Sequence, residues 1–364
     1  MNRVLFITGS LFNPVGGPYH SVKATALAFQ KQGFKVSIIG TKDEPQQDSS
    51  AATYIKHPEI KVTALRKYGP YNMHFSFNFL SYWKAVKAAD YISLQGVWML
   101  NCLLVALFAT VLRKPFYFAI RGEFNDPESL GSVDKRLIKP IVKFLFNKAD
   151  FIQVLNPREV HPLNSYGVKV PIEIIPNGIE SPNSQGQVVR QKSVLYIGRI
   201  HPMKGLYELI DAWSKAELKG WSLIIAGDGE EAHKEEILKK ASLKKSIEYV
   251  GPVRGAFKED LLRESMWFAL PSFMEGMPMA VLEAMSYGLP VLISEECNLP
   301  LVFTSDAGIK VDPNTESIFK GLKTIESLDS DIYNKFTLRA KKLVEEHFKW
   351  ENAVNQLVKS FKTN

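Results

Sequence analysis

The chain has 364 residues and a formal net charge of +7, and it is 46% hydrophobic and 23% charged. This composition excludes an intrinsically disordered chain, and two distant cysteines, Cys102 and Cys297, exclude a disulfide framework and favour a reducing cytoplasm. The length exceeds one ordinary hydrophobic core, so two α/β domains of roughly 150–200 residues each are expected.

The positive charge lies in the first half of the chain. Residues 1–182 hold 21 Lys and Arg against 13 Asp and Glu, whereas residues 183–364 hold 24 against 25. This asymmetry indicates an anionic partner for the first half, either nucleic acid or a phospholipid surface. No helix-turn-helix, zinc-finger or RNA-binding signature supports nucleic acid, so we do not expect it as a partner.

Short apolar runs alternate with segments of helical period in the first half, which is typical of parallel strands joined by crossover helices. The predicted strands are 4–8, 35–39, 61–65, 91–94, 116–120, 151–154 and 172–175. The predicted helices are 18–32, 77–89, 98–112, 133–147 and 157–165. The chain start shows no cleavable signal, and the apolar run 97–112 is shorter than the ~20 residues that a bilayer needs.

Two features of the first half could contact a ligand or a surface. Gly16 and Gly17 follow the first strand, where they let the backbone approach a phosphate or an acceptor or simply form a tight turn. Residues 136–148 form a basic amphipathic stretch. This stretch either lies on an anionic membrane, where each basic residue contributes ~1 kcal/mol, or is a crossover helix with a solvated cationic side. We expect the protein in the cytoplasm. If the basic stretch lies on the membrane, we expect the protein to be peripheral at the inner face of that membrane.

A polar segment, 176–191, separates the two halves, and the alternation then restarts. The predicted strands are 193–197, 222–226, 247–250, 267–270, 291–293 and 308–311. The predicted helices are 204–216, 230–242, 257–264, 278–287, 315–326, 331–347 and 351–362. The expected fold is therefore α/β, with two Rossmann-like doubly wound domains, 1–182 and 183–349, facing across a cleft. The last helix, from about residue 350, can pack back on the first domain.

Two cations follow the first strand of the second half. Arg199 and Lys204 stand between Gly198 and the next predicted helix. Both side chains can reach one pyrophosphate, where Arg offers a planar fork of donors and Lys a point charge. Such cations stabilise the negative charge that grows on a departing diphosphate. This spacing alone is weak evidence, because Arg199 could instead pair with a surface carboxylate and Lys204 could be solvated.

The densest pattern is residues 270–285, where a strand ends, a loop follows and a helix is predicted to begin at Pro278. The backbone amides of Met279, Ala280 and Val281 are then predicted to be unpaired donors. A helix start of this kind, at the carboxyl edge of a parallel sheet, suits a diphosphate.

Glu275 and Glu283 belong to the same segment but are too far apart to form one acid/base pair. Glu275, in the loop, can contact a hydroxylated ligand, and Glu283, in the helix, can accept hydrogen bonds from a ribose. Taken alone, either glutamate could also be an ordinary solvated carboxylate, Glu275 in a loop and Glu283 on the face of a helix.

Together these motifs resemble the retaining sugar-nucleotide glycosyltransferases of family 4, group 1, which have the two-domain GT-B fold. The resemblance covers the second half throughout and is specific only as a combination. It is carried by Gly198-Arg199, Lys204-Gly205, Pro271-Ser272, Glu275-Gly276, Leu282-Glu283-Ala284, Ala226 to Gly229 and Tyr249 to Gly251, and in the first half by Gly16-Gly17 and Pro176 to Ile179.

The resemblance implies a role for each matching residue. Arg199 and Lys204 would bind the donor diphosphate and stabilise the leaving group, and Glu275 would contact the donor sugar. Glu283 would hold the ribose, and the backbone near Val253 would meet the base. The other implied donor contacts are Gly16, Gly17, Arg121, Gly198, Gly227, Gly276, Met277, Pro278 and Met279. No metal and no cofactor besides the sugar-nucleotide substrate are implied.

The first half departs from the family at one place. Many members have a histidine there that touches the donor sugar, whereas Arg121 or Glu123 occupies this place here, and Gln95 ends the preceding strand pattern. The expected function is transfer of a sugar, with retention, from a UDP- or GDP-sugar to a glycan or lipid-linked acceptor in surface polysaccharide or glycolipid assembly.

Other functions on the same fold stay open at this point. They are a nucleotide-sugar epimerase, a phosphorylase and a non-catalytic nucleotide-sugar-binding subunit. A dinucleotide-dependent dehydrogenase is not expected, because no Gly-x-Gly-x-x-Gly follows the first strand.

Overall fold

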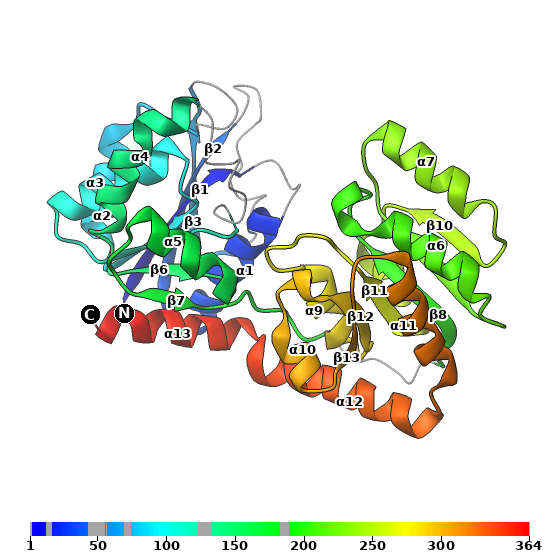
Figure 1. The fold of residues 1–364 in the computed structure, drawn as a ribbon. Coiled ribbons are helices and arrows are strands. Elements are labelled where there is room, and N and C mark those ends of the chain that lie inside the picture. The colour runs from blue at the N-terminus through cyan, green and yellow to red at the C-terminus, as the bar shows by residue number, and fades with distance from the viewer. Residues whose placement is uncertain are drawn as a thin grey trace. The chain divides into compact units, whose positions relative to one another are not determined.

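The computed structural model, drawn in Figure 1, describes residues 2–11, 17–42, 55, 57–68, 74–122, 133–182 and 189–363. It folds as two compact units. The first comprises Met1–Gly178 with Trp350–Asn364, and the second comprises Ile179–Lys349. Gly16, Glu123 and residues 183–188 of the predicted linker lie outside the described residues.

The first unit contains a seven-stranded parallel sheet in the order β3-β2-β1-β4-β5-β6-β7. The inner strands are buried on both faces because helices cover both sides, which explains why they are continuous apolar runs in the sequence. The strands are β1 (Arg3–Ser10), β2 (Lys35–Lys42), β3 (Ile60–Arg66), β4 (Tyr91–Gln95), β5 (Phe116–Ala119), β6 (Phe151–Val154) and β7 (Ile172–Ile174). The helices are α1 (Gly17–Lys31), α2 (Phe79–Ala88), α3 (Leu100–Val111), α4 (Val133–Phe146), η3 (Pro157–Glu159), α5 (Val160–Tyr166) and α13 (Trp350–Thr363).

Helix α13, the last element of the chain, belongs to the first unit although 171 residues of the second unit precede it. It packs on α1. The ring of Phe361 lies 4.6 Å from Tyr91, 5.4 Å from Tyr117 and 5.2 Å from Phe151, measured between centroids. These aromatic contacts attach the end of the chain to three strands of the first sheet.

The second unit contains a six-stranded parallel sheet in the order β10-β9-β8-β11-β12-β13. Its strands are β8 (Gln191–Ile197), β9 (Ser222–Ala226), β10 (Ile247–Gly251), β11 (Ser265–Leu270), β12 (Val291–Ser294) and β13 (Gly308–Val311). Its helices are η4 (Pro202–Lys204), α6 (Leu206–Ala216), α7 (Glu231–Ala241), α8 (Gly255–Glu264), α9 (Met279–Ser286), η5 (Glu295–Cys297), α10 (Pro300–Thr304), α11 (Thr315–Ser327) and α12 (Ser330–His347). The sequence prediction missed η5 and α10.

Apart from the additional edge strand β7 of the first unit, both sheets have the same strand order. In each, the chain forms one side of the sheet outward from the centre and then returns to the centre to form the other side. The predicted α/β doubly wound class is confirmed for both units. The order reverses between β1 and β4 in the first sheet and between β8 and β11 in the second. In open parallel sheets, ligands bind beyond the carboxyl ends of the strands at this reversal.

Candidate active site in the second unit

The two predicted motifs of the second unit meet at the strand-order reversal. Strands β8 and β11 pair in parallel, with Val194 opposite Trp267 and Leu195 opposite Phe268. The loop after β8 contains Arg199 and Lys204, and the loop after β11, about seventy residues later in the chain, contains Glu275. Because parallel neighbours end at the same edge, both loops leave the sheet side by side.

The turn after β8 differs in detail from the prediction of a helix from residue 204. Lys204 ends the short helix η4, and α6 starts only at Leu206. Gly205 lies between them with φ +66, and a Cβ built on it would fall 2.0 Å from the carbonyl oxygen of Pro271. The turn therefore approaches the β11 loop more closely than any other residue type would allow.

His201 caps this turn through its side chain. Its Nδ1 accepts a hydrogen bond of 3.2 Å from the backbone N–H of Met203. Burial and then the neighbouring Arg199 lower the pKa of His201 below its ordinary value. The ring is therefore neutral at pH 7, and only the neutral ring leaves Nδ1 free to accept this bond.

Lys204 and Glu275 form the central ion pair of the site. The Lys204 Nζ lies 2.5 Å from Oε1 of Glu275, and both side chains are largely buried, with 20% and 10% of their surfaces exposed. Ser272 Oγ donates to the same Oε1 at 2.9 Å. Within the described residues no donor occupies the second oxygen of Glu275, so this carboxylate can still accept from a ligand hydroxyl.

The β11 loop is held by main-chain and side-chain hydrogen bonds to the turn that follows the next strand, β12. Glu275 N–H donates to the Glu296 carbonyl at 3.1 Å, and Asn298 Nδ2 donates to the Glu275 carbonyl at 2.5 Å. Asn298 also lies 3.4 Å from the Gly276 carbonyl and adopts a left-handed φ of +57. The sequence analysis missed Asn298, although an Asn just after a helical turn, here η5, is typical of this left-handed conformation.

Replacing Asn298 by glycine is expected to lower kcat/KM for the reaction of this site about tenfold with little change in Tm. Glycine keeps the left-handed backbone, so the variant removes only the amide that holds the main chain at Glu275. Initial rates at varied substrate concentration and a thermal melt check this. Unchanged kinetics in Asn298→Gly would mean that the loop holds its geometry without the amide.

The start of helix α9 corrects two details of the prediction. Pro278 is extended, with ψ 103, and stands before the helix, which begins at Met279. The N–H of Val281 is not an unpaired donor, because it donates to the Pro278 carbonyl at 3.1 Å. Among the described residues, the N–H groups of Met279 and Ala280 have no acceptor, so two donors rather than three remain for an anion.

Glu283 is paired rather than merely solvated. Its Oε2 lies 2.5 Å from Nζ of Lys258, and each side chain is 27% exposed. Lys258 lies on α8, which follows β10 and the segment with Val253. Sequence reasoning missed Lys258, because nothing in its own neighbourhood indicates a contact with a residue on α9.

The remaining predicted residues of the second unit lie at the same edge of the sheet. Arg199 is exposed, stands two residues after the end of β8, and makes no ion pair with any described carboxylate. Gly198 N–H donates to the Ala226 carbonyl at 3.1 Å. Gly227, with φ +149, lies so close to Gly198 that a Cβ added to Gly227 would fall 1.8 Å from the Gly198 oxygen. The ends of β8 and β9 are therefore packed backbone on backbone.

Arg121 belongs to the first unit, where it follows β5 with a left-handed φ of +46. Its Nε donates to Gln95 Oε1 at 2.7 Å and its Nη1 donates to Asn177 Oδ1 at 2.6 Å. Both acceptors are neutral side-chain amides. Gly17 is the first residue of α1.

The basic stretch 136–148 lies mostly on α4, as predicted. Ile141 and Phe144 are exposed by 54% and 52%. Lys148 Nζ lies 5.6 Å from the centroid of the Phe144 ring. In the part of the chain that the structure describes, no helix combines the length and apolar character needed to cross a membrane.

Two protein-family models match the chain. Residues 15–181 match the model for glycosyltransferase family 4, and residues 179–343 match the model for glycosyl transferases group 1. The two matches meet close to the boundary between the structural units at Gly178.

Individual relatives and solved structures are also similar. The chain is 35% identical over 131 residues to an amylovoran biosynthesis glycosyltransferase of Erwinia amylovora, a match that spans 36% of this chain and only 37% of that relative. It is 23% identical over 389 residues to the GDP-mannose:cellobiosyl-diphosphopolyprenol alpha-mannosyltransferase of Xanthomonas campestris. This match covers 99% of this chain and 96% of that enzyme. The crystal structure of Anabaena HepE in complex with UDP and glucose superposes with a TM-score of 0.78 at 16% identity over 100% of both chains, a likeness of fold.

Proposed function

The chain belongs to the group 1 glycosyltransferases of family 4. We propose that it transfers a sugar, with retention, from a UDP- or GDP-sugar to a glycan or lipid-linked acceptor. The observation that supports this most is the pair Lys204–Glu275, 2.5 Å apart where the strand order reverses. A sugar diphosphate is expected to bind at this edge of the sheet. The edge offers it the Lys204 cation, the second oxygen of the Glu275 carboxylate and the two N–H groups at the start of α9.

In the proposed reaction the donor diphosphate lies on Lys204, Arg199 and the N–H groups of Met279 and Ala280. As the bond between the sugar and the diphosphate breaks, these groups stabilise the charge on the leaving phosphate, so no metal is required. Glu275 holds a hydroxyl of the donor sugar, and the acceptor hydroxyl attacks from the face that the diphosphate leaves. The sugar carbon is then oxocarbenium-like in the transition state.

The other residues implied by the resemblance complete the proposed donor site. Glu283 binds the ribose, the backbone near Val253 meets the base, and Arg121 faces the donor sugar. The further proposed contacts are Gly16, Gly17, Gly198, Gly227, Gly276, Met277 and Pro278. Besides this donor and the acceptor, the proposed reaction uses no separate cofactor.

Similarity to an amylovoran biosynthesis enzyme and to a diphosphopolyprenol mannosyltransferase favours polysaccharide or lipid-linked sugar assembly as the setting. We place the enzyme in the cytoplasm, in peripheral contact with an anionic membrane through α4. The exposed Ile141 and Phe144 beside Lys143 and Lys148 suit the interface of such a membrane.

Incubation of the purified protein with each sugar nucleotide, with and without acceptors, tests the proposal. Transfer to an acceptor, with an unchanged anomeric configuration read by NMR, is expected. Conversion of the donor without an acceptor would instead identify an epimerase. Binding of the donor without any turnover, under all acceptor conditions, would identify a non-catalytic subunit.

Replacing Glu283 by glutamine is expected to weaken nucleoside diphosphate binding about tenfold, because a charge-assisted bond to the ribose becomes a neutral one. Glu326→Gln is the matched control, since Glu326 is also 27% exposed and paired with a lysine, but lies on α11. Isothermal titration with UDP and GDP measures the two affinities. An equal affinity in both variants would remove Glu283 from the donor site.

A further inference from the structure

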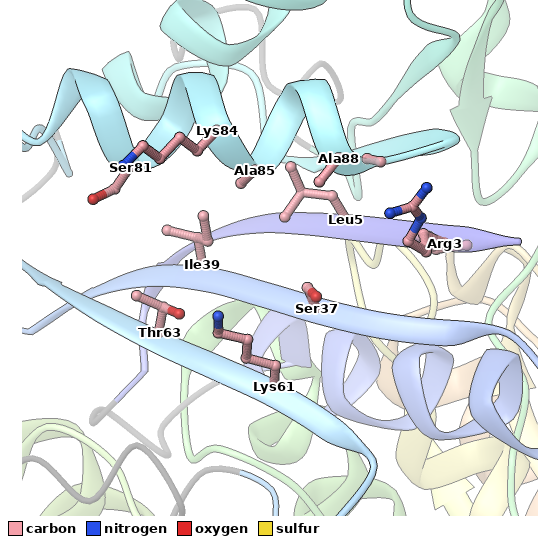
Figure 2. Close-up of a pocket in the computed structure, with 12 residues that line it drawn as sticks. Arg3, Leu5, Ser37, Ile39, Lys61, Thr63, Ser81, Lys84, Ala85 and Ala88 are labelled. Carbon is pink, nitrogen blue, oxygen red and sulfur yellow. The ribbon is translucent and has the colours of Figure 1, made fainter.

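A hollow of about 350 Å³ lies in the first unit between helix α2 and the strands β1, β2 and β3 (Figure 2). Small side chains make this space: Ala85, Ala88 and Ala89 at the end of α2, and Ser37 on β2. Residues with longer apolar side chains, Leu5 and Ile39, form one wall. The hollow is thus a consequence of an alanine-rich helix face over a strand that carries a serine.

The register of the sheet places polar groups in this hollow. Leu5 lies opposite Ser37, and Ser37 lies opposite Lys61, so these three side chains form one row across the sheet. In the next row, Thr63 lies opposite Ile39. The face therefore changes from apolar on β1 to polar and cationic on β3.

Three cations from three different elements border the hollow: Arg3 of β1, Lys61 of β3 and Lys84 of α2. Arg3 is paired with Asp90, whose Oδ2 lies 3.7 Å from Arg3 Nε. Lys61 and Lys84 form no ion pair with any described carboxylate. Glu59, the acidic residue nearest to Lys61 in the sequence, accepts a hydrogen bond from Gln30 of α1.

Three hydroxyl groups add donors to the same hollow. Ser37, Thr63 and Ser81 all border it, and in the described part of the structure their side chains make no hydrogen bond within the protein. Figure 2 shows Ser81 and Lys84 on the α2 side and Ser37, Thr63 and Lys61 on the strand side. Cations and hydroxyl donors that converge in this way suit an oxyanion with several acceptor oxygens.

The hollow is distinct from the edge of this sheet where substrates are expected. Arg3 is the first residue of β1, and Lys61 is the second of β3, so the cations lie near the amino-terminal ends of the strands. Substrates of doubly wound domains bind at the carboxyl ends. A ligand here would therefore leave the transfer site free.

We infer that this hollow binds a phosphate group carried by a small molecule or by a phospholipid headgroup. The unpaired Lys61 and Lys84 supply the charge, the hydroxyls of Ser37, Thr63 and Ser81 donate to the phosphate oxygens, and Leu5 and Ile39 contact the carbon part next to the phosphate. This site does not depend on the proposed transfer reaction, because none of its residues belongs to the proposed donor site.

Two double variants of equal net charge test the site in the full chain. Lys61→Gln with Lys84→Gln removes both unpaired cations of the hollow. Lys87→Gln with Lys215→Gln removes two exposed lysines, one from α2 and one from α6, that do not line it. Isothermal titration with glycerol 1-phosphate measures a soluble ligand, and co-sedimentation with phosphatidylglycerol or phosphatidylcholine vesicles measures the lipid.

We expect the Lys61/Lys84 variant to lose at least about tenfold in affinity, and the Lys87/Lys215 variant to stay within about twofold of the unmodified protein. If the Lys61/Lys84 variant loses affinity for glycerol 1-phosphate, the ligand is a soluble phosphate ester. If it loses affinity only for phosphatidylglycerol vesicles, the ligand is a lipid headgroup. Equal affinities for the two variants with both probes, or no binding of either probe, would overturn the inference.

Discussion

Lys204→Ala is expected to lower kcat for sugar transfer about 10²–10³-fold, the loss that follows removal of one preorganised group facing developing charge. Lys204 is fixed by the ion pair with Glu275 at 2.5 Å and by the turn that Gly205 ends. Its ammonium group is thus in place before the leaving diphosphate acquires charge. Arg199→Ala should cause a similar loss, because Arg199 has no described carboxylate partner and is free to bind the same diphosphate.

Steady-state rates, nucleoside diphosphate affinities and thermal melts on both variants test this expectation. Lys310→Ala is the control, since Lys310 pairs with Glu295 on the surface of the same unit and lies outside the proposed site. The control should keep its rate. If Lys204→Ala transferred sugar at a near-normal rate with its fold intact, the diphosphate would have to lie elsewhere.

Most of the fold could be predicted because strands buried on both faces form uninterrupted apolar runs. The bounds of β6 (Phe151–Val154), whose four residues are all buried, agree with the prediction to the residue. The bounds of the less buried β9 (Ser222–Ala226) and of the edge strand β13 (Gly308–Val311) also agree. Helix α10 was missed because a five-residue helix is too short to show a periodic pattern. Its first residue, Pro300, is equally typical of a loop.

The site was predictable where one motif directly follows one strand. Arg199, Lys204 and Glu275 follow neighbouring strands, so a doubly wound sheet must bring their loops together. Lys258 and Asn298 were not predictable, because their contacts with Glu283 and with the Glu275 carbonyl join elements through tertiary packing alone. The number of free amides on α9 likewise required the backbone geometry of Pro278.

Gly227→Ala is expected to destabilise the second unit by about 3 kcal/mol and to weaken nucleotide binding. Gly227 has φ +149, and its added Cβ would lie 1.8 Å from the Gly198 oxygen and 3.0 Å from the Gly198 carbonyl carbon. Both atoms are backbone, so no side chain can rotate away. The ends of β8 and β9 would have to separate, which adds overpacking to backbone strain.

The same separation would disturb the proposed donor site, because Arg199 directly follows Gly198. The N–H of Gly227 also donates to the Gly251 carbonyl at 2.9 Å, so β10 would be displaced as well. Gly220→Ala is the control that has the backbone strain without the close contact. Gly220, which lies before β9, has φ +74 but no atom within 4 Å of an added Cβ. That variant should lose only the ~1–2 kcal/mol of left-handed strain and keep its nucleotide affinity.

Denaturant unfolding and titration with UDP and GDP compare the two alanine variants directly. A larger loss of stability and of affinity in Gly227→Ala means that the backbone contact between β8 and β9 sets the position of the cations. Equal stability and equal affinity in the two variants would show that the strand ends adjust freely. The close approach of Gly227 to Gly198 would then have no part in placing Arg199 for the diphosphate.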